Sequence, residues 1–306
     1  MSQRKCYLYI FITGCLWGLI GTFVKILEMS GSSATYSAFL RMFFGCFILG
    51  IYCLIKEGYR VFKISKRTLF FCMMLGVFSQ GIYNLTYNLA IERIGVSYSA
   101  ILLNVSPLFT TILSFVFFKE KIDKHKQRGI LINILGAIIT VLSSFTGQAD
   151  LIPIGFLYAV ITAVCYAVCP IFGKLTDKKD SALAVATYSS LFASLFLLIL
   201  NPFKEITNLM DIKILAVGFL FALFTTGIAD CFYYAGVKSI MDSSKVPILA
   251  SSSLFVATIL SMVLFKEKIN LLKLTGLIMV FFSIIYINKG KNEQGNDFVQ
   301  VKYKLK

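Results

Sequence analysis

The chain has 306 residues, of which 58% are apolar, and a formal net charge of +15. Its mean hydropathy of +0.80 leaves too little polar surface for a water-soluble globular protein. The basic residues form short clusters between apolar runs rather than one amphipathic surface, which argues against a nucleic-acid-binding protein. The composition therefore predicts an integral membrane protein.

Apolar runs of about 18 to 25 residues recur along the whole chain, and a helix of that length crosses a hydrocarbon core of ~30 Å. Charged residues or Gly, Asn and Pro separate the runs. We predict an all-α membrane protein with ten transmembrane helices. In chain order these are Cys6–Leu27, Ala34–Ile55, Thr68–Ile91, Val96–Phe118, Arg128–Thr146, Ile152–Lys174, Ala182–Leu200, Ile212–Val237, Ser243–Phe265 and Leu271–Asn288.

The loop charges indicate the orientation of these helices. Most of the 30 lysines and arginines lie on the side of the N-terminus, for example between Lys56 and Arg67 and between Lys119 and Arg128. Positively charged loops favour the cytoplasmic side of a membrane. We therefore expect a multi-pass protein of the cell (plasma) membrane with both termini in the cytoplasm.

An internal repeat links the two halves of the chain. The segment Thr111–Ile122 reads almost the same as Thr258–Ile269, including a shared Phe-Lys-Glu-Lys-Ile at the end of each predicted helix. A nearby offset aligns Trp17 with Tyr166, so the similarity also reaches the first helix of each half. A gene duplication explains this pattern.

Five helices per half is an odd number, so the two copies would enter the membrane in opposite directions. We predict a first repeat over 1–149, an inverted second repeat over 150–288 and a polar cytoplasmic tail over 289–306. Inverted repeats of this kind support alternating access in secondary transporters.

Several short motifs resemble the EamA family of the drug/metabolite transporter superfamily. They are Trp17-Gly18, Phe39-Leu40-Arg41, Ser106-Pro107-Leu108-Phe109 and the two Phe-Lys-Glu-Lys-Ile helix ends. The resemblance implies a ten-helix, two-repeat transporter with a central cavity, often an exporter of amino acids or related metabolites. The second half departs from the pattern, because Ala193 stands near the place of a partner of Arg41.

Two ionisable residues lie well inside the predicted helices. Arg41 and Asp230 are each about seven residues from the nearer end, roughly 10 Å deep at ~1.5 Å per residue. Such residues are costly in a bilayer and are functional candidates by default. Asp230 could couple transport to protons or contact a cation, since partial desolvation disfavours its charged form. The alternative is an Asp fixed by hydroxyl and backbone partners.

Polar side chains follow one face of the third predicted helix. Gln80, Asn84 and Asn88 are spaced four residues apart, with Tyr83 and Tyr87 close to the same stripe. This face is expected either to line a substrate cavity or to form interhelical hydrogen bonds. Inverted symmetry places Asn84 at a depth similar to that of Arg41.

The eighth predicted helix repeats this arrangement, with Asp230 aligned to Asn84 and Tyr233 aligned to Tyr87. Because the depths of Arg41 and Asp230 leave roughly 10 Å between them along the membrane normal, a direct salt bridge is not expected. The aromatic residues Trp17 and Tyr166 are expected to form opposing walls of the cavity, or simply to pack. The predicted substrate-cavity residues are Trp17, Arg41, Gln80, Tyr83, Asn84, Tyr87, Asn88, Tyr166, Asp230, Tyr233 and Tyr234.

Three prolines, Pro107, Pro170 and Pro247, lie within or near the start of predicted helices and are candidate hinges. The sequence offers no nucleophile, metal set or acid/base pair for an enzyme, and no nucleotide-binding motif. Cys165 and Cys169 share a helix face but lack further ligands, so we expect no metal site and no cofactor.

The expected function is secondary transport of small metabolites, such as amino acids or related compounds, and most simply their export. Its partners would be a small-molecule substrate, membrane lipids and, if Asp230 is a coupling site, protons, but not nucleic acid. Two alternatives remain: a lipid or carrier-lipid transporter on the same fold, and a channel or uniporter. A channel would favour a continuous polar stripe rather than two polar patches. Monomer and homodimer are both compatible with the sequence.

Overall fold

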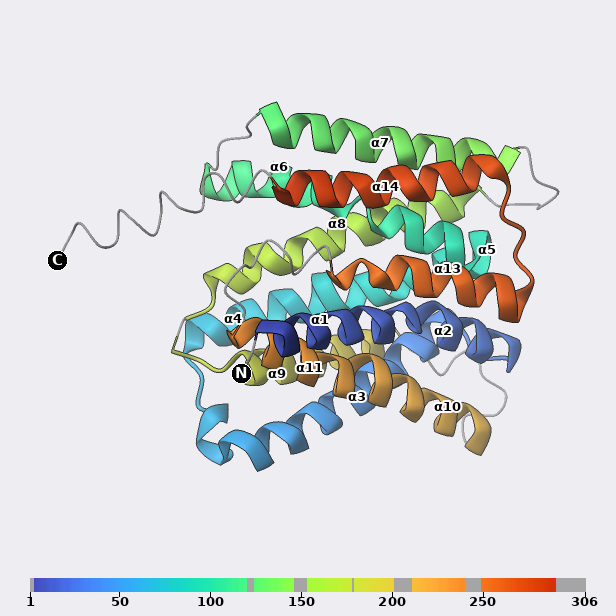
Figure 1. The fold of residues 1–306 in the computed structure, drawn as a ribbon. Coiled ribbons are helices and arrows are strands. Elements are labelled where there is room, and N and C mark those ends of the chain that lie inside the picture. The colour runs from blue at the N-terminus through green and yellow to red at the C-terminus, as the bar shows by residue number, and fades with distance from the viewer. Residues whose placement is uncertain are drawn as a thin grey trace.

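A computed structural model describes residues 3–119, 124–145, 153–177, 179–200, 211–239 and 249–289. Within these ranges the chain forms helices joined by turns, and no strand is present. Figure 1 shows the long helices lying side by side, with α7 and α14 along one edge and α3 and α10 at the opposite edge. The predicted all-helical class is confirmed.

The first half of the chain contains the following elements: α1 (Gln3–Gly18), α2 (Ile20–Met29), α3 (Ala34–Glu57), the 3₁₀ turn η1 (Tyr59–Phe62), α4 (Lys66–Met74), the π-helix η2 (Leu75–Ile82), α5 (Tyr83–Leu103), α6 (Ser106–Phe118) and α7 (Lys124–Phe145). The second half contains α8 (Pro153–Leu175), α9 (Ala182–Ile199), α10 (Ile212–Ala222), the π-helix η3 (Leu223–Ile228), α11 (Ala229–Ser239), α13 (Ser252–Phe265) and α14 (Leu271–Lys289).

Seven helical stretches of the described chain are long and apolar enough to cross a membrane, and three further apolar helices are shorter. The short ones are Ser106–Phe118, Ser252–Phe265 and Leu271–Ile287. The predicted fourth helix is shortened because the chain makes a turn at Asn104 and Val105 before α6 begins. The chain is thus a multi-pass membrane protein, while ten spans in two inverted halves stay a prediction.

Serine side chains start three of the helices that cross this bundle. The hydroxyl of Ser33 accepts the backbone N–H of Tyr36 at the start of α3, and Ser65 caps α4 through the N–H of Thr68. Ser181 does the same for α9. Such caps satisfy backbone donors that have no partner within the helix, which fixes where each helix begins.

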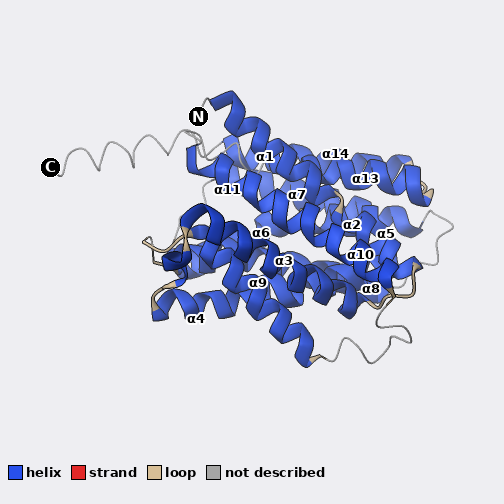
Figure 2. Cartoon of the chain, turned by 90° about the horizontal axis from the view of Figure 1, so that it is seen from below, coloured by secondary structure: helices blue, strands red, loops and turns tan. Residues whose placement is uncertain are grey.

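The two halves of the chain interleave. The most extensive helix contacts are between α7 and α14, α5 and α8, α3 and α9, and α1 and α11. Each pair joins a helix from the first half to one from the second (Figure 2). Neither half therefore buries its helix faces independently of the other.

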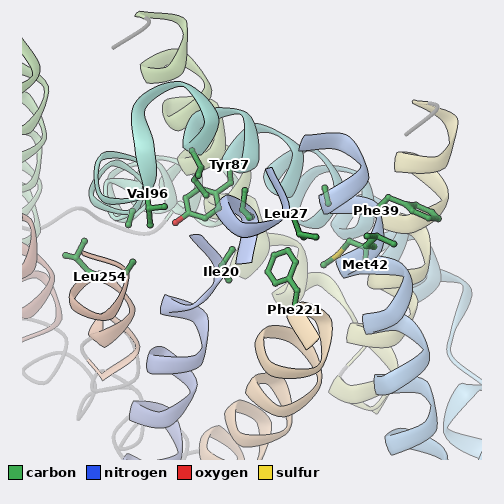
Figure 3. Packing of buried hydrophobic residues seen from close by; sticks show 14 of the residues in the cluster. Ile20, Leu27, Phe39, Met42, Tyr87, Val96, Phe221 and Leu254 are labelled. Atoms are coloured by element: carbon green, nitrogen blue, oxygen red, sulfur yellow. The ribbon is translucent and has the colours of Figure 1, made fainter. Parts of the chain in front are cut away.

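The largest buried cluster of the described residues lies where seven helices converge, namely α2, α3, α5, α9, α10, α13 and α14. It includes Leu27 of α2, Met42 of α3, Tyr87 of α5, Phe221 of α10 and Leu254 of α13 (Figure 3). Phe221 and Leu254 are fully buried. Packing of this kind, rather than a hydrophobic effect between helices, drives association within lipid.

A partly buried carboxylate just after the end of α13 connects this helix to the helical segment that begins at Val96. The Glu267 carboxylate accepts the backbone N–H groups of Val96 at 2.7 Å and Ser97 at 3.2 Å, and Lys273 Nζ lies 3.6 Å from it. Gly95 has a φ of +81°, and a Cβ there would lie 2.6 Å from a Glu267 oxygen. Glycine is therefore needed both for the backbone conformation and for the approach of the carboxylate.

Glu267→Gln should lower the thermal stability of the purified protein. The change leaves the ammonium of Lys273, whose side chain is 2% exposed, without a counter-charge and weakens the helix cap. We expect a loss of about 2 kcal/mol or more, because removing one partner leaves a buried charge uncompensated. Thermal unfolding in detergent measures this change.

The matched control is Glu28→Gln, which breaks the exposed pair between Lys25 and Glu28. Exposed pairs contribute roughly 0–1 kcal/mol. Equal losses in the two variants would contradict a structural role for the Glu267 cap.

Candidate functional site

The predicted site residues lie next to two π-helices, η2 and η3. In η3 the N–H of Ala229 donates to Phe224 O and Thr226 O, so it bypasses Thr225 O, its partner in an α-helix. In η2 the N–H of Tyr83 likewise bypasses Ser79 O. Local π-turns inside helices are frequent at functional sites, where they expose main-chain carbonyls and redirect side chains.

Arg41 of α3 uses one of these exposed carbonyls. Its Nη2 donates to Thr225 O at 3.3 Å, its Nε to Thr226 Oγ1 at 3.3 Å and its Nη1 to Asn84 Oδ1 at 2.6 Å. The guanidinium carbon lies 5.2 Å from the ring centre of Phe221, and Arg41 is 6% exposed. The charge is therefore surrounded by protein dipoles and an aromatic face.

Small residues allow α3 to come this close to η3. A Cβ on Gly45 would lie 2.9 Å from Thr226 Cγ2, and one on Gly227 would lie 2.5 Å from Ile48 Cγ2. Any side chain at either position would push the helices apart and stretch the Arg41 hydrogen bonds. Close backbone approach through glycine is a common way for membrane helices to pack.

The polar stripe of the third predicted helix divides into two parts. Asn84, 1% exposed, accepts from Arg41 and donates through Nδ2 to Gln80 O at 2.6 Å. Asn88, also 1% exposed, donates to Ala34 O at 3.0 Å at the start of α3. Gln80 is partly exposed. The structure thus places the amides of Asn84 and Asn88 in interhelical hydrogen bonds, whereas Gln80 retains access to open space.

Asp230 lies in the first turn of α11 and is partly exposed. The Trp17 indole N–H donates a hydrogen bond to its carboxylate. Arg41 lies in electrostatic range of Asp230, although its donors are directed at Asn84, Thr225 and Thr226. Because the donors of Arg41 are directed at these other groups, its guanidinium leaves the carboxylate of Asp230 able to accept other donors.

Aromatic rings from four helices form two pairs in the region of Asp230. Trp17 of α1 and Tyr233 of α11 have ring centres 5.3 Å apart, and Tyr83 of α5 and Tyr166 of α8 have ring centres 5.6 Å apart. Tyr166 is 38% exposed, and both Tyr166 and Tyr233 lie in electrostatic range of Asp230. The residues predicted to form opposing walls therefore each pair with a tyrosine of the other half.

The remaining predicted residues have different placements. Tyr87 is 4% exposed and stacks on Tyr83 with ring centres 6.0 Å apart. Pro107 lies in the first turn of α6, after the turn that interrupts the predicted fourth helix, and Pro170 lies inside α8. Pro247 and the side chain of Tyr234 lie outside the described residues.

Sequence reasoning missed Thr225, Thr226 and Phe221, which hold the Arg41 guanidinium. A signal was present. The offset that aligns Asn84 with Asp230 also aligns Ser79-Gln80-Gly81 with Thr225-Thr226-Gly227, and these triplets lie within η2 and η3. Each π-helix thus contains a hydroxyl residue, a polar residue and a glycine in this order, about one turn before Asn84 or Asp230.

Ionisable residues held inside long apolar helices are typical of a multi-pass membrane transporter. The model of the EamA-like transporter family matches residues 4–142 and again residues 153–289. Because the matches cover most of the chain, this protein belongs to the EamA-like transporter family.

Several curated relatives are similar to this chain along most of its length. An uncharacterized transporter of Bacillus subtilis, YetK, is 28% identical over 257 residues, covering 81% of this chain and 73% of YetK. YxxF of the same organism, also an uncharacterized transporter, is 23% identical over 92% of this chain and 88% of its own length. An uncharacterized transporter of Archaeoglobus fulgidus is 24% identical over 289 residues, covering 93% of this chain and 98% of its own length.

A solved crystal structure has the same fold. Its chain superposes with a TM-score of 0.63 at 15% identity, covering 93% of this chain and 96% of the other.

Asn84→Leu should destabilise the protein more than Thr226→Val does. The first change removes the 2.6 Å acceptor of a buried guanidinium and the donor to Gln80 O, while the second removes one 3.3 Å acceptor. We expect losses of about 2–3 kcal/mol and about 1 kcal/mol. Thermal unfolding of the purified variants compares them.

Asn84→Asp is the matched control, because it keeps the acceptor oxygen and adds a charge-assisted hydrogen bond to Arg41. It also loses the donor to Gln80 O, so its stability should lie between those of Asn84→Leu and the wild type. If it loses as much stability as Asn84→Leu, Arg41 is not held through this oxygen.

Proposed function

We propose that the chain is a secondary transporter that works by alternating access between two inverted five-helix repeats. Features that recur at matched positions support this. Lys119 after α6 and Lys266 after α13 both adopt a left-handed conformation, with φ of 54° and 53°. The π-helix η2 lies just before Asn84, and the π-helix η3 lies just before Asp230. Each of the four most extensive helix contacts joins one helix of the first half to one of the second.

The observation that carries the proposal is Asp230. A partly exposed carboxylate beside a buried Arg41, at depth within apolar helices, is costly unless it is used. It accepts from Trp17 and has aromatic rings on either side, so a ligand that carries an amino group fits its chemistry. We infer that the substrate is a small metabolite that carries an amino group, in the range from amino acids to related compounds such as amines, and that the transporter exports it.

The same carboxylate offers a route to proton coupling. Asp230 would bind either a proton or the positively charged group of the substrate, so that inward proton movement exchanges for outward substrate movement. The groups that face it are Trp17, Tyr166, Tyr233, Cys169 and Arg41. The transporter would lie in the plasma membrane with both termini in the cytoplasm, as the loop charges favour.

The lipid-transporter alternative has less support. An apolar groove between α3 and α9 has a volume of about 130 Å³ and is lined by residues such as Phe39, Phe43 and Leu195. Sites for drug-sized ligands occupy roughly 300–1,000 Å³. The volume of this groove lies below that range, and its walls offer almost no polar partner for a head group.

The inverted arrangement predicts that Lys119 and Lys266 lie on opposite sides of the membrane. Both side chains are exposed. In a background without the eight native cysteines, Lys119→Cys should react with a membrane-impermeant maleimide only after the cells are permeabilised, whereas Lys266→Cys should react in intact cells. Labelling of both from the same side would contradict the inverted repeat.

Asp230→Asn should abolish the effect of a proton gradient on transport. Proteoliposomes with the wild type should take up a labelled substrate, from a panel of amino acids and amines, at a rate that depends on the gradient. The variant keeps the shape of the side chain but cannot exchange a proton, so any remaining flux should be gradient-insensitive.

The control is Asp211→Asn at the cap of α10, where Asn serves as well as Asp. It should transport like the wild type. Gradient-dependent flux that survives in Asp230→Asn would show that the coupling site is elsewhere, and gradient-independent flux in the wild type would indicate a uniporter.

A further inference from the structure

We propose that the site around Asp230 selects small organic cations, that is, amines without a free carboxylate, over zwitterionic amino acids. The inference rests on the proposed function, because it names the substrate class of the same site. It begins from the difference between the two charged residues. Asp230 is partly exposed, whereas Arg41 is 6% exposed and has a protein acceptor for each of its three nitrogens.

Arg41 is therefore poorly placed to receive a substrate carboxylate. Three of the five N–H donors of its guanidinium are taken by Asn84 Oδ1, Thr225 O and Thr226 Oγ1. To reach the remaining two, a carboxylate would have to enter the buried space around Arg41 and lose its hydration. The ring of Phe221, 5.2 Å from the guanidinium carbon, covers a further part of the charge.

The accessible charge of the site is consequently negative. Asp230 accepts one hydrogen bond from Trp17, and a carboxylate can accept several more. An ammonium group supplies those donors and compensates the charge. The carboxylate of an amino acid would gain no comparable partner, and it would also lose its hydration.

The aromatic rings favour the same kind of ligand. Tyr233 follows Asp230 by three residues on α11, so the two side chains share a helix face, and the Trp17 ring lies 5.3 Å from the Tyr233 ring. Tyr83 and Tyr166 form the second ring pair. Ring faces attract a desolvated cation, and they also pack against an apolar body.

Trp17 makes the proposal directly measurable. It is the single tryptophan among 306 residues, and its indole N–H contacts the carboxylate in question. The intrinsic tryptophan fluorescence of the purified protein therefore reports on this site alone. We would titrate it with three ligands that share a phenyl group and differ in charge: 2-phenylethylamine, phenylalanine and 3-phenylpropionate.

The amine should change the fluorescence saturably, phenylalanine should bind at least about tenfold more weakly, and the anion should have no effect. Asp230→Asn should weaken binding of the amine about tenfold or more, while Asp230→Glu should restore much of it. Tyr233→Leu should weaken binding about fivefold. Asp211→Asn, far from the site, should bind like the wild type.

Equal or tighter binding of phenylalanine would overturn the proposed selectivity, and so would the absence of a response to all three ligands. Binding that is unchanged in Asp230→Asn would do the same. Transport is tested separately by flux in proteoliposomes. An amine that binds but does not move would contradict the transport function and leave the charge selectivity intact; moving phenylalanine but not the amine would contradict the selectivity and leave transport intact.

Discussion

The arrangement of the site depends on how a guanidinium is kept within an apolar helix bundle. Arg41 is buried, and in such surroundings an unpaired charge is strongly unfavourable. Groups from both halves stabilise the charge: an amide from α5, a hydroxyl and a carbonyl from η3, and the ring of Phe221. The position of Arg41 thus ties α3 to elements that are far apart in the sequence.

This requirement also gives the π-helix η3 a physical purpose. A regular α-helix would use Thr225 O internally, whereas the π-turn leaves it for Arg41 Nη2. Gly45 and Gly227 then allow α3 and η3 to approach within hydrogen-bonding distance. The same turn sits directly before Asp230, so any rearrangement of η3 would move the carboxylate and the Arg41 contacts together.

Hydropathy predicted the helices well and their interruptions poorly. The predicted starts at Ala34, Ala182, Ile212 and Leu271 coincide with those of α3, α9, α10 and α14. The turns at Leu19 and at Asn104 and Val105 were missed, because a break of one or two residues barely changes the apolar content of a helix. Hydropathy also missed the π-helices, since their apolar content matches that of the flanking α-helices, and only the internal repeat carries a signal for them.

The site was predictable where the argument used depth and the internal repeat. Arg41 and Asn84 were expected at similar depths, and a 2.6 Å hydrogen bond joins them. The partners in η3 were missed because hydroxyl and backbone groups carry no charge signal. Aligning the starts of α3 and α9 sets Ser189 opposite Arg41, four residues before Ala193, which the sequence pattern placed near that position.

With Ser189 opposite Arg41, the two halves differ in charge at two pairs of matched positions. At one pair of matched positions the first half has Arg41 and the second half Ser189; at the other pair the first half has Asn84 and the second half Asp230. Arg41 bonds the neutral amide, which keeps its position without cancelling its charge, and Asp230 has no arginine at the matched position in its own half. If Asp230 and Asn84 were exchanged, the carboxylate would be locked in an ion pair with Arg41 and unable to exchange ligands. The unequal copies therefore separate a fixed structural charge from one that remains available for binding.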